Sequence, residues 1–351
     1  MKHCIFYFSV ALVLSTGSPT SQAADHALSE YPRLPGETDD APRLQRAVDA
    51  TPSGVLDIGP GLYKIAQTVS VTNLCSLRLD GTARLVAVAQ MDYVLRVNNA
   101  PLYESLDWYS ARRNDYGMFV CGGMIDGNGL ASCMMLDGFH HYTLRDTTFL
   151  NGKRYGLAVD AEDGTGYELV AKDLNFRCTM PGLAGNTAFL LNGGDCHATD
   201  CMVVDYTIGF HLPRKGANRL TRCRVRCGDI PPPAVGEPPE MLKDSVCFKL
   251  GSHSAILRDC HADVGETGYE IDTKDTRLIG CSAGGGEAVG LGSVTHIRHV
   301  SGRLLATDCA FAKNAANCQA YEGCGRVQWR DAIYTGFGPG DDCPGAADFG
   351  N

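Results

Sequence analysis

Residues 257–272, LRDCHADVGETGYEID, combine the residue types of metal sites and acid–base centres in one short run. Cys260 and His261 are adjacent, and adjacent residues of a strand face opposite sides, so this pair cannot chelate one ion. No Cys-x-x-Cys or His-x-x-x-His spacing occurs elsewhere, so we predict no structural zinc site. Calcium held by surface carboxylates is the one cofactor that the sequence leaves open.

The run belongs to a repeat. A piece of the pattern x-Asp-Cys-x-Val recurs at 144–149, 171–176, 198–203, 220–225, 257–262, 278–283 and 306–311. A second piece follows most copies, at 155–159, 188–192, 209–213, 247–251, 268–272 and 289–293. Both pieces alternate with period two, as strands do, and Gly, Asn and Asp separate them. Repetition every 20 to 30 residues or so, without helical segments, predicts an all-β parallel β-helix over residues 25–351 as a single domain.

Cysteines of the first piece share the phase of its apolar residues, so we expect them to face inward. They are Cys201, Cys223, Cys260, Cys281 and Cys309. A free cysteine packs as a small apolar residue, and stacked side chains run parallel, which does not suit disulfide geometry. We therefore predict a buried cysteine ladder.

The outward positions of the second piece give the candidate site, and they read Ala158, Leu190, His211, Lys249, Glu270 and Gly290. Three different ionisable groups would lie on successive coils, about 4.8 Å apart. The charged residues that flank the same strands are Asp205, Asp244 and Glu266 before them, and Arg214, Lys215, Asp272 and Lys274 after them. A solvated face with ion pairs between strands is the alternative interpretation.

Further candidates for substrate binding lie on the first piece and in two loops. Arg224 and His261 are expected as outward neighbours, and so are Arg226 and Asp263. The proline-rich segment 229–244 is either a groove wall or a passive insertion. Aromatic residues in segment 101–117 belong either to a sugar-binding loop or to packing over the helix, and they include Trp108 and Tyr109.

The front of the chain carries a recognisable set of motifs. Residues 37–50 predict a short helix, with Asp39 or Asp40 as its cap and Pro42 in its first turn. DDAPRLQRAV at 39–48, GPGLYKI at 59–65 and GGMIDGNG at 122–129 resemble motifs of the pectate-lyase superfamily. The resemblance implies a right-handed β-helix whose N-terminal end is capped by the helix, and a carbohydrate-active function. The active-site motifs of polygalacturonases are not present.

Two reactions on a glycan fit these residues. Elimination from a uronate requires a base, for which Lys249 or His211 is available, and positive charge on the substrate carboxylate. Arg214, Lys215 or calcium would supply that charge, and Glu270 would orient a cation. Hydrolysis requires two carboxylates, which would come from Asp205, Asp244, Glu266 and Glu270. We expect a lyase acting on an acidic polysaccharide, with a glycoside hydrolase and a non-catalytic carbohydrate-binding protein as alternatives.

Bulk composition limits the partners. The chain has 31 basic and 40 acidic residues. Residues 1–24 read as a secretory signal peptide, with Lys2 before an apolar run too short to span a bilayer. Its removal leaves 30 basic and 40 acidic residues, a net charge of −10. That charge argues against nucleic acids and anionic membranes as partners. We therefore expect a secreted protein, extracellular or periplasmic.

Overall fold

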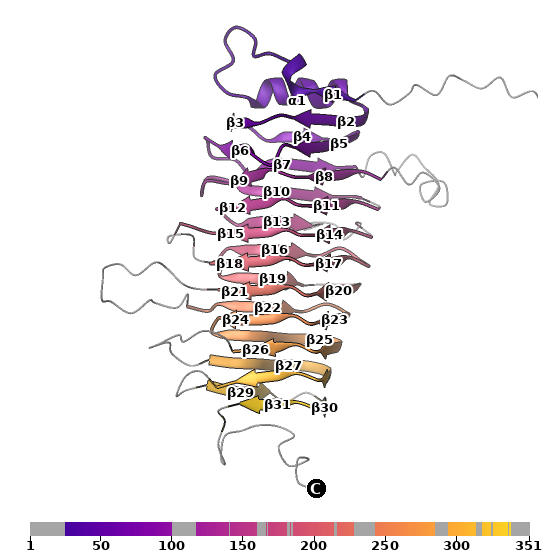
Figure 1. Cartoon of the computed structure of the whole chain (residues 1–351), viewed down its shortest axis with the longest axis vertical. Helices are drawn as coiled ribbons and strands as arrows, with labels where there is room; N and C mark the ends of the chain where they lie inside the picture. The colour runs from indigo at the N-terminus through magenta and orange to yellow at the C-terminus, as the bar shows by residue number, and fades with distance from the viewer. Residues whose placement is uncertain are drawn as a thin grey trace, which may run out of the picture.

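The computed structural model describes residues 25–99, 117–139, 141–159, 166, 168–180, 183, 185–213, 216–227, 243–284, 294–313, 318–323, 326–335 and 337. Within these residues the chain winds into a right-handed parallel β-helix, in which every paired strand runs parallel to its neighbours (Figure 1). Each coil contributes short strands to three faces. The fold expected from the repeat and from the family resemblance is confirmed.

The first face carries the candidate site. Its strands, each paired with the next, are β4 (Val69–Val71), β7 (Tyr93–Asn98), β10 (Ser132–Asp137), β13 (Tyr155–Val159), β16 (Thr187–Leu191), β19 (Ile208–Leu212), β22 (Val246–Leu250), the beginnings of β25 (Thr267–Ile279) and β27 (Val294–Thr307), and β29 (Cys318–Gly323).

The second face follows in each coil. Its strands are β1 (His26–Ala27), β2 (Ser53–Ile58), β5 (Leu74–Leu79), β8 (Phe119–Cys121), β11 (Thr143–Arg145), β14 (Val170–Lys172), β17 (His197–Thr199), β20 (Ala217–Thr221), β23 (Ser254–Arg258), the ends of β25 and β27, and β30 (Arg326–Arg330).

The third face is a separate sheet and completes each coil. Its strands are β3 (Gly61–Ile65), β6 (Ala83–Ala87), β9 (Met124–Asp126), β12 (Thr148–Leu150), β15 (Asn175–Arg177), β18 (Met202–Val204), β21 (Arg224–Arg226), β24 (His261–Val264), β26 (Ser282–Ala283), β28 (Ala310–Ala312) and β31 (Ile333–Thr335).

In six coils an aspartate makes the bend between the second and third faces. Its φ is 55, 53, 57, 52, 54 and 52° at Asp146, Asp173, Asp200, Asp259, Asp308 and Asp331, respectively. Arg222 and Gly280 take this position in two other coils, with φ of 50 and 62°. Aspartate tolerates this left-handed conformation better than most residues. The repeated piece expected to form one strand is therefore two short strands joined by a left-handed turn. The expectation of a single strand was wrong because the aspartate of the repeat is a turn residue.

Helix α1 (Ala41–Ala50) covers the N-terminal end of the solenoid (Figure 1). Its residues Ala41, Leu44 and Val48 are buried, and the helix shields the first coil from water. The carboxylate of Asp39 accepts a hydrogen bond from the N–H of Ala41 at 2.8 Å. The helix begins four residues after the start of the predicted segment 37–50, and Asp40, one of the two predicted caps, directly precedes it. The carboxylate of Asp40 binds the guanidinium of Arg33.

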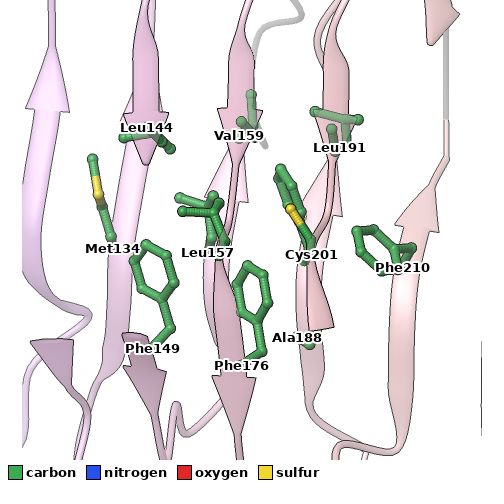
Figure 2. Packing of buried hydrophobic residues seen from close by; sticks show 14 of the residues in the cluster. Met134, Leu144, Phe149, Leu157, Val159, Phe176, Ala188, Leu191, Cys201 and Phe210 are labelled. Atoms are coloured by element: carbon green, nitrogen blue, oxygen red, sulfur yellow. The ribbon is translucent and has the colours of Figure 1, made fainter. Parts of the chain in front are cut away.

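Aromatic rings form a column through the core. Neighbouring ring centroids lie 5.0, 5.5, 5.7, 5.5 and 5.0 Å apart along the series Phe149, Phe176, Phe189, Phe210, Phe248 and Tyr269. All six rings are buried. Figure 2 shows Phe149, Phe176 and Phe210 pointing into the interior together with Leu157 and Cys201. One stacked ring per coil thus repeats along this part of the core.

The five cysteines of the repeat are buried and free. They follow one another along the stack, since the N–H of Arg224 bonds to the carbonyl of Cys201 and the N–H of His261 bonds to that of Cys223, each at 2.9 Å. Burial raises the pKa of Cys309 to about 11. A thiol that stays protonated in an apolar interior is a packing group rather than a nucleophile.

Candidate functional site

A continuous row of outward positions runs along the first face. The strand register sets next to one another Ser70, Arg96, Met135, Ala158, Leu190, His211, Lys249, Glu270, Arg298 and Glu322. We call these ten residues the first-face row. The structure thus brings His211, Lys249 and Glu270 together as the sequence predicts. Arg298, and not Gly290, follows Glu270, because the next strand of this face begins at Val294.

Glu270 lies between two cations. Lys249 Nζ is 3.0 Å from Glu270 Oε1, and Arg298 Nη1 is 3.7 Å from Glu270 Oε2. Arg298 also reaches Glu322, at 3.3 Å. Lys249 is thus held in an ion pair with Glu270, and the strand register sets it next to His211.

His211 has the opposite character. Burial lowers the pKa of its imidazole, the charge of Lys249 lowers it further and the charge of Glu270 raises it, and together they set it to about 4. The ring is consequently neutral at pH 7 and has a lone pair available. A neutral imidazole beside a lysine ammonium, about 4.8 Å away by strand spacing, is an arrangement suited to taking a proton from a bound anion.

The middle of the row is apolar. Met135, Ala158 and Leu190 are buried and form a cluster separate from the main core, against which Tyr93 and Tyr155 pack. The guanidinium of Arg154 lies 4.9 Å from the centroid of the Tyr155 ring. Tyrosine faces and short apolar side chains suit the apolar side of a sugar ring.

A cavity of 640 Å³ opens beside this cluster, at the N-terminal half of the row. Tyr93, Arg96, Ser132, Lys153 and Arg154 contribute to its lining. Arg96 Nη2 also holds the carboxylate of Asp137, at 3.0 Å. The sequence interpretation missed this part of the face, because it compared coils only from residue 144 onward. The available signal was β7, where Arg96 lies between the buried Leu95 and Val97.

The flanking carboxylates lie apart from the row. The N–H of Asp244 donates to the carboxylate of Glu266 at 2.7 Å. Glu266 precedes Glu270 by four residues, or about 13 Å along an extended strand. Asp205 occupies the turn before β19, where burial raises its pKa against the opposing charges of Arg226 and Arg177. The structure does not place these three acids beside His211.

Asp272 and Lys274 lie further along β25, where the chain passes from the first face to the second. The hydroxyl of Ser301 donates to the carboxylate of Asp272. Lys274 lines a second cavity, of 820 Å³, together with Arg303 and Arg326. This cavity is cationic, although the carboxylate of Asp275 accepts a hydrogen bond from Arg303 at 3.0 Å.

Arg224, Arg226 and His261 lie on the third face, away from the row. Arg224 pairs in register with His261 as expected. Arg226 does not pair with Asp263, because a register shift between Val225 and Arg226 sets it against Val264. Asp263 turns instead to Arg224, at 2.5 Å. That pairing prediction was wrong, since period-two counting cannot anticipate a bulge.

Some predicted residues lie outside the described part of the chain: Arg214, Lys215, Trp108, Tyr109 and most of the proline-rich loop 229–244. The same holds for the signal peptide 1–24. Among the residues that are described, no three His, Cys, Asp or Glu side chains gather as a metal ion would require. No helix in that part is long and apolar enough to cross a membrane.

Comparisons with known proteins match the fold and not the sequence. No protein-family model and no curated protein matches the chain. A mutant tailspike protein of E. coli bacteriophage HK620 in complex with a pentasaccharide is similar in structure, with a TM-score of 0.58 at 11% identity, over 89% of this chain and 67% of the tailspike. An endo-xylogalacturonan hydrolase from Aspergillus tubingensis has a TM-score of 0.52 at 12% identity, over 89% and 93% of the two chains. The chain therefore shares the right-handed β-helix fold of pectate-lyase-like proteins.

Proposed function

We propose that the protein acts on an acidic polysaccharide and cleaves it by β-elimination on the first face, with His211 as the base. The observation that carries the proposal is the first-face row itself: a neutral imidazole adjoins Lys249, and Lys249 adjoins Glu270 and Arg298. The tailspike neighbour is bound to a pentasaccharide and the Aspergillus neighbour is named for hydrolysis of a glycan. A glycan ligand is therefore compatible with this fold.

The proposed reaction uses three residues of the row. His211 takes the proton on the carbon next to the uronate carboxylate, and a double bond forms between that carbon and the neighbouring ring carbon. The bond from the neighbouring carbon to the glycosidic oxygen breaks, and water or the imidazolium of His211 gives that oxygen a proton. Lys249 offsets the negative charge that grows on the carboxylate as the proton leaves. Binding of the anionic sugar would raise the pKa of His211 toward neutrality and make it a stronger base. Glu270 holds the ammonium of Lys249 in place.

Cations elsewhere on the face support an acidic substrate. The 640 Å³ cavity is lined by three cations, Arg96, Lys153 and Arg154, against one carboxylate, Asp92, with Tyr93 as an apolar contact for the sugar ring. Arg96 and His211 are four coils apart, or about 19 Å by strand spacing. An extended glycan lying along the solenoid axis would contact both ends of the row.

Hydrolysis is the weaker alternative on this geometry. A glycosidase needs a protonated carboxylic acid beside a second carboxylate. Glu270 and Glu322 lie two coils apart, about 9.6 Å by strand spacing, but Arg298 lies between them and forms an ion pair with each. Asp205 has a raised pKa but lies in a turn away from the row.

Product analysis on a panel of uronate-containing polysaccharides tests the proposal. Elimination leaves a conjugated double bond that absorbs ultraviolet light, and its two products together lack one water relative to those of hydrolysis. We expect these products from the wild type and not from His211→Ala, while Met202→Ala on the third face serves as the matched control. New reducing ends without the double bond would establish hydrolysis. No turnover across the panel would favour a binding protein. Export of the chain by its predicted signal peptide would place this activity outside the cytoplasm.

A further inference from the structure

A hydrogen-bonded chain of serine, histidine and aspartate lies on the third face. His261 Nδ1 is 2.5 Å from the hydroxyl oxygen of Ser282, and His261 Nε2 is 2.5 Å from Asp263 Oδ1. Asp263 Oδ2 in turn binds Arg224 Nε at 2.5 Å. These groups are separate from the first-face row and take no part in the proposed elimination.

The sequence and the strand register build this cluster. Ser282 pairs directly with His261 across β26 and β24, so their side chains extend from the same side of the sheet. The register shift in β24 leaves Asp263 without a partner on β21 and turns its carboxylate toward His261 and Arg224. Bulges that re-aim a side chain in this way are common beside functional sites.

The serine is held in a fixed position. The hydroxyl of Tyr269 is 2.9 Å from both the Ser282 and the Cys260 carbonyl oxygens, on the inner side of the sheet. Tyr269 itself is fully buried at the end of the aromatic column. The backbone that presents Ser282 is therefore anchored to the core, while its hydroxyl faces outward and is partly exposed.

The contacts fix where the protons lie. Burial disfavours the charge on Asp263, but hydrogen bonds from His261 and Arg224 outweigh it and keep the pKa of Asp263 below its usual value. An ionised carboxylate accepts hydrogen bonds only, so His261 Nε2 carries the hydrogen. In the neutral ring Nδ1 is then the acceptor, and the hydroxyl of Ser282 donates to it. A serine that donates to an imidazole, itself oriented by a carboxylate, is an activated nucleophile.

We propose that Ser282, His261 and Asp263 form a second catalytic site that cleaves small carboxylic esters. Ser282 Oγ attacks the ester carbonyl carbon as His261 Nδ1 takes the hydroxyl proton. The bond to the alcohol oxygen breaks, and the imidazolium returns the proton to that oxygen. Water then attacks the acyl-serine and gives its proton to His261. The bond from the acyl carbon to Ser282 Oγ breaks, the imidazolium returns the proton to that oxygen, and the acid leaves. Asp263 keeps the imidazole in the required tautomer throughout.

Oxyanion stabilisation sets the expected rate. The N–H of Ser282 is bonded to the Cys260 carbonyl and that of Gly284 to the Ala262 carbonyl, so neither is available to the substrate. One missing oxyanion donor lowers kcat by about 100- to 1000-fold. We therefore expect turnover first with esters of good leaving groups. If the proposed function holds, the natural substrates of this site would be O-acyl esters on the glycan.

The test uses 4-nitrophenyl acetate and needs no glycan, so its outcome is independent of the elimination reaction. We expect nitrophenol release above the buffer rate, and an acetyl group on Ser282 in peptides from acid-quenched wild-type protein. Ser282→Ala should abolish the excess release, and His261→Ala should lower it about 100-fold or more. Asp263→Asn should lower the rate and shift its pH profile, because the amide no longer fixes the tautomer.

Ser301→Ala is the matched control. Ser301 is also an exposed serine on a strand and donates to a carboxylate, that of Asp272, with no imidazole in this contact. This variant should retain the full rate. The proposal would be overturned if the wild type released nitrophenol no faster than Ser282→Ala, or if the acetyl group were found on other residues and not on Ser282. Detection of acetyl-Ser282 in the wild type does not depend on the folding of any variant.

Discussion

At the scale of single residues, His211 differs most from an ordinary surface histidine. Its pKa of about 4 results first from burial and then from the charge of Lys249. The value of kcat/KM, which reports the free enzyme, should therefore fall only as pH drops through about 4, and not through the range usual for histidine. The His211→Asn variant should lower kcat by about 100- to 10,000-fold, which is the range for loss of a general base. Steady-state rates with a uronate polymer, measured against pH, check both expectations.

The same pKa predicts how stability depends on pH. The unfolded chain binds a proton at this histidine below its ordinary pKa of 6.5, whereas the folded protein does so only below a pKa of about 4. The contribution of His211 to stability is thus present above pH 6.5 and is lost as pH falls toward 4. His211→Asn should lose less stability over this range than the wild type. Parallel pH dependences of the two free energies of unfolding would contradict the assignment.

Lys249 is expected to act through its charge. Lys249→Met should lower kcat/KM on a uronate polymer strongly, because the carboxylate then meets no cation next to the base. Lys249→Arg keeps the charge and should retain a larger part of the activity. On a methyl-esterified substrate, which carries no charge at that position, the two variants should differ little. An equal loss in both variants on the charged substrate would instead indicate that Lys249 acts through its shape or as a proton acceptor.

At the scale of elements, the aromatic column is the repeated stabilising unit. Phe210 has a ring on each side, Phe189 at 5.7 Å and Phe248 at 5.5 Å. Phe149 ends the column and has a single stacked ring, Phe176 at 5.0 Å. Phe210→Ala should destabilise the fold by about 3–5 kcal/mol. Phe149→Ala should lower the free energy of unfolding by less than Phe210→Ala, and the difference should be about 0.5–1.5 kcal/mol, the contribution of one ring pair. Denaturant unfolding of both variants measures the difference, and equal losses would exclude a role for stacking.

The sequence predicted the strands, and the side to which their residues point, wherever the same type of residue recurs at the same position of each coil. Period-two alternation placed Cys201 inside and Lys249 outside, because each coil repeats one geometry. The bend at Asp173 was hidden within a pattern that reads as one strand, since a left-handed turn does not interrupt the alternation. Asp263 binds Arg224 and not the predicted Arg226, because the bulge in β24 depends on how this strand pairs with the neighbouring coil. Arg298 was missed because the number of residues between successive strands of the first face varies.

At the scale of the whole molecule, charge is distributed unevenly along the stack. The chain is acidic overall, with 31 basic and 40 acidic residues. Arg96, Lys153 and Arg154 nevertheless gather at one cavity of the first face. An acidic protein with a local cationic groove binds a polyanion through that groove and repels it elsewhere. Binding of a uronate polymer should therefore weaken as salt is raised.

Calcium is the cofactor that the sequence left open. Lys249 and Arg298 supply positive charge at the proposed centre, so activity on uronate polymers should survive extensive treatment with EDTA. Rates measured before and after chelation, and after calcium is returned, check this. Loss of activity on chelation with recovery on calcium would assign the charge on the substrate carboxylate to the ion rather than to Lys249.

The central claim is that a neutral His211 beside a cationic Lys249 eliminates across a uronate linkage. Mass analysis of the products from one uronate polymer, with wild type and His211→Asn side by side, tests it most directly. We predict unsaturated products, lighter by one water than those of hydrolysis, from the wild type and their loss in the variant. Hydrated products from the wild type, or unsaturated products formed at an equal rate by the variant, would contradict it.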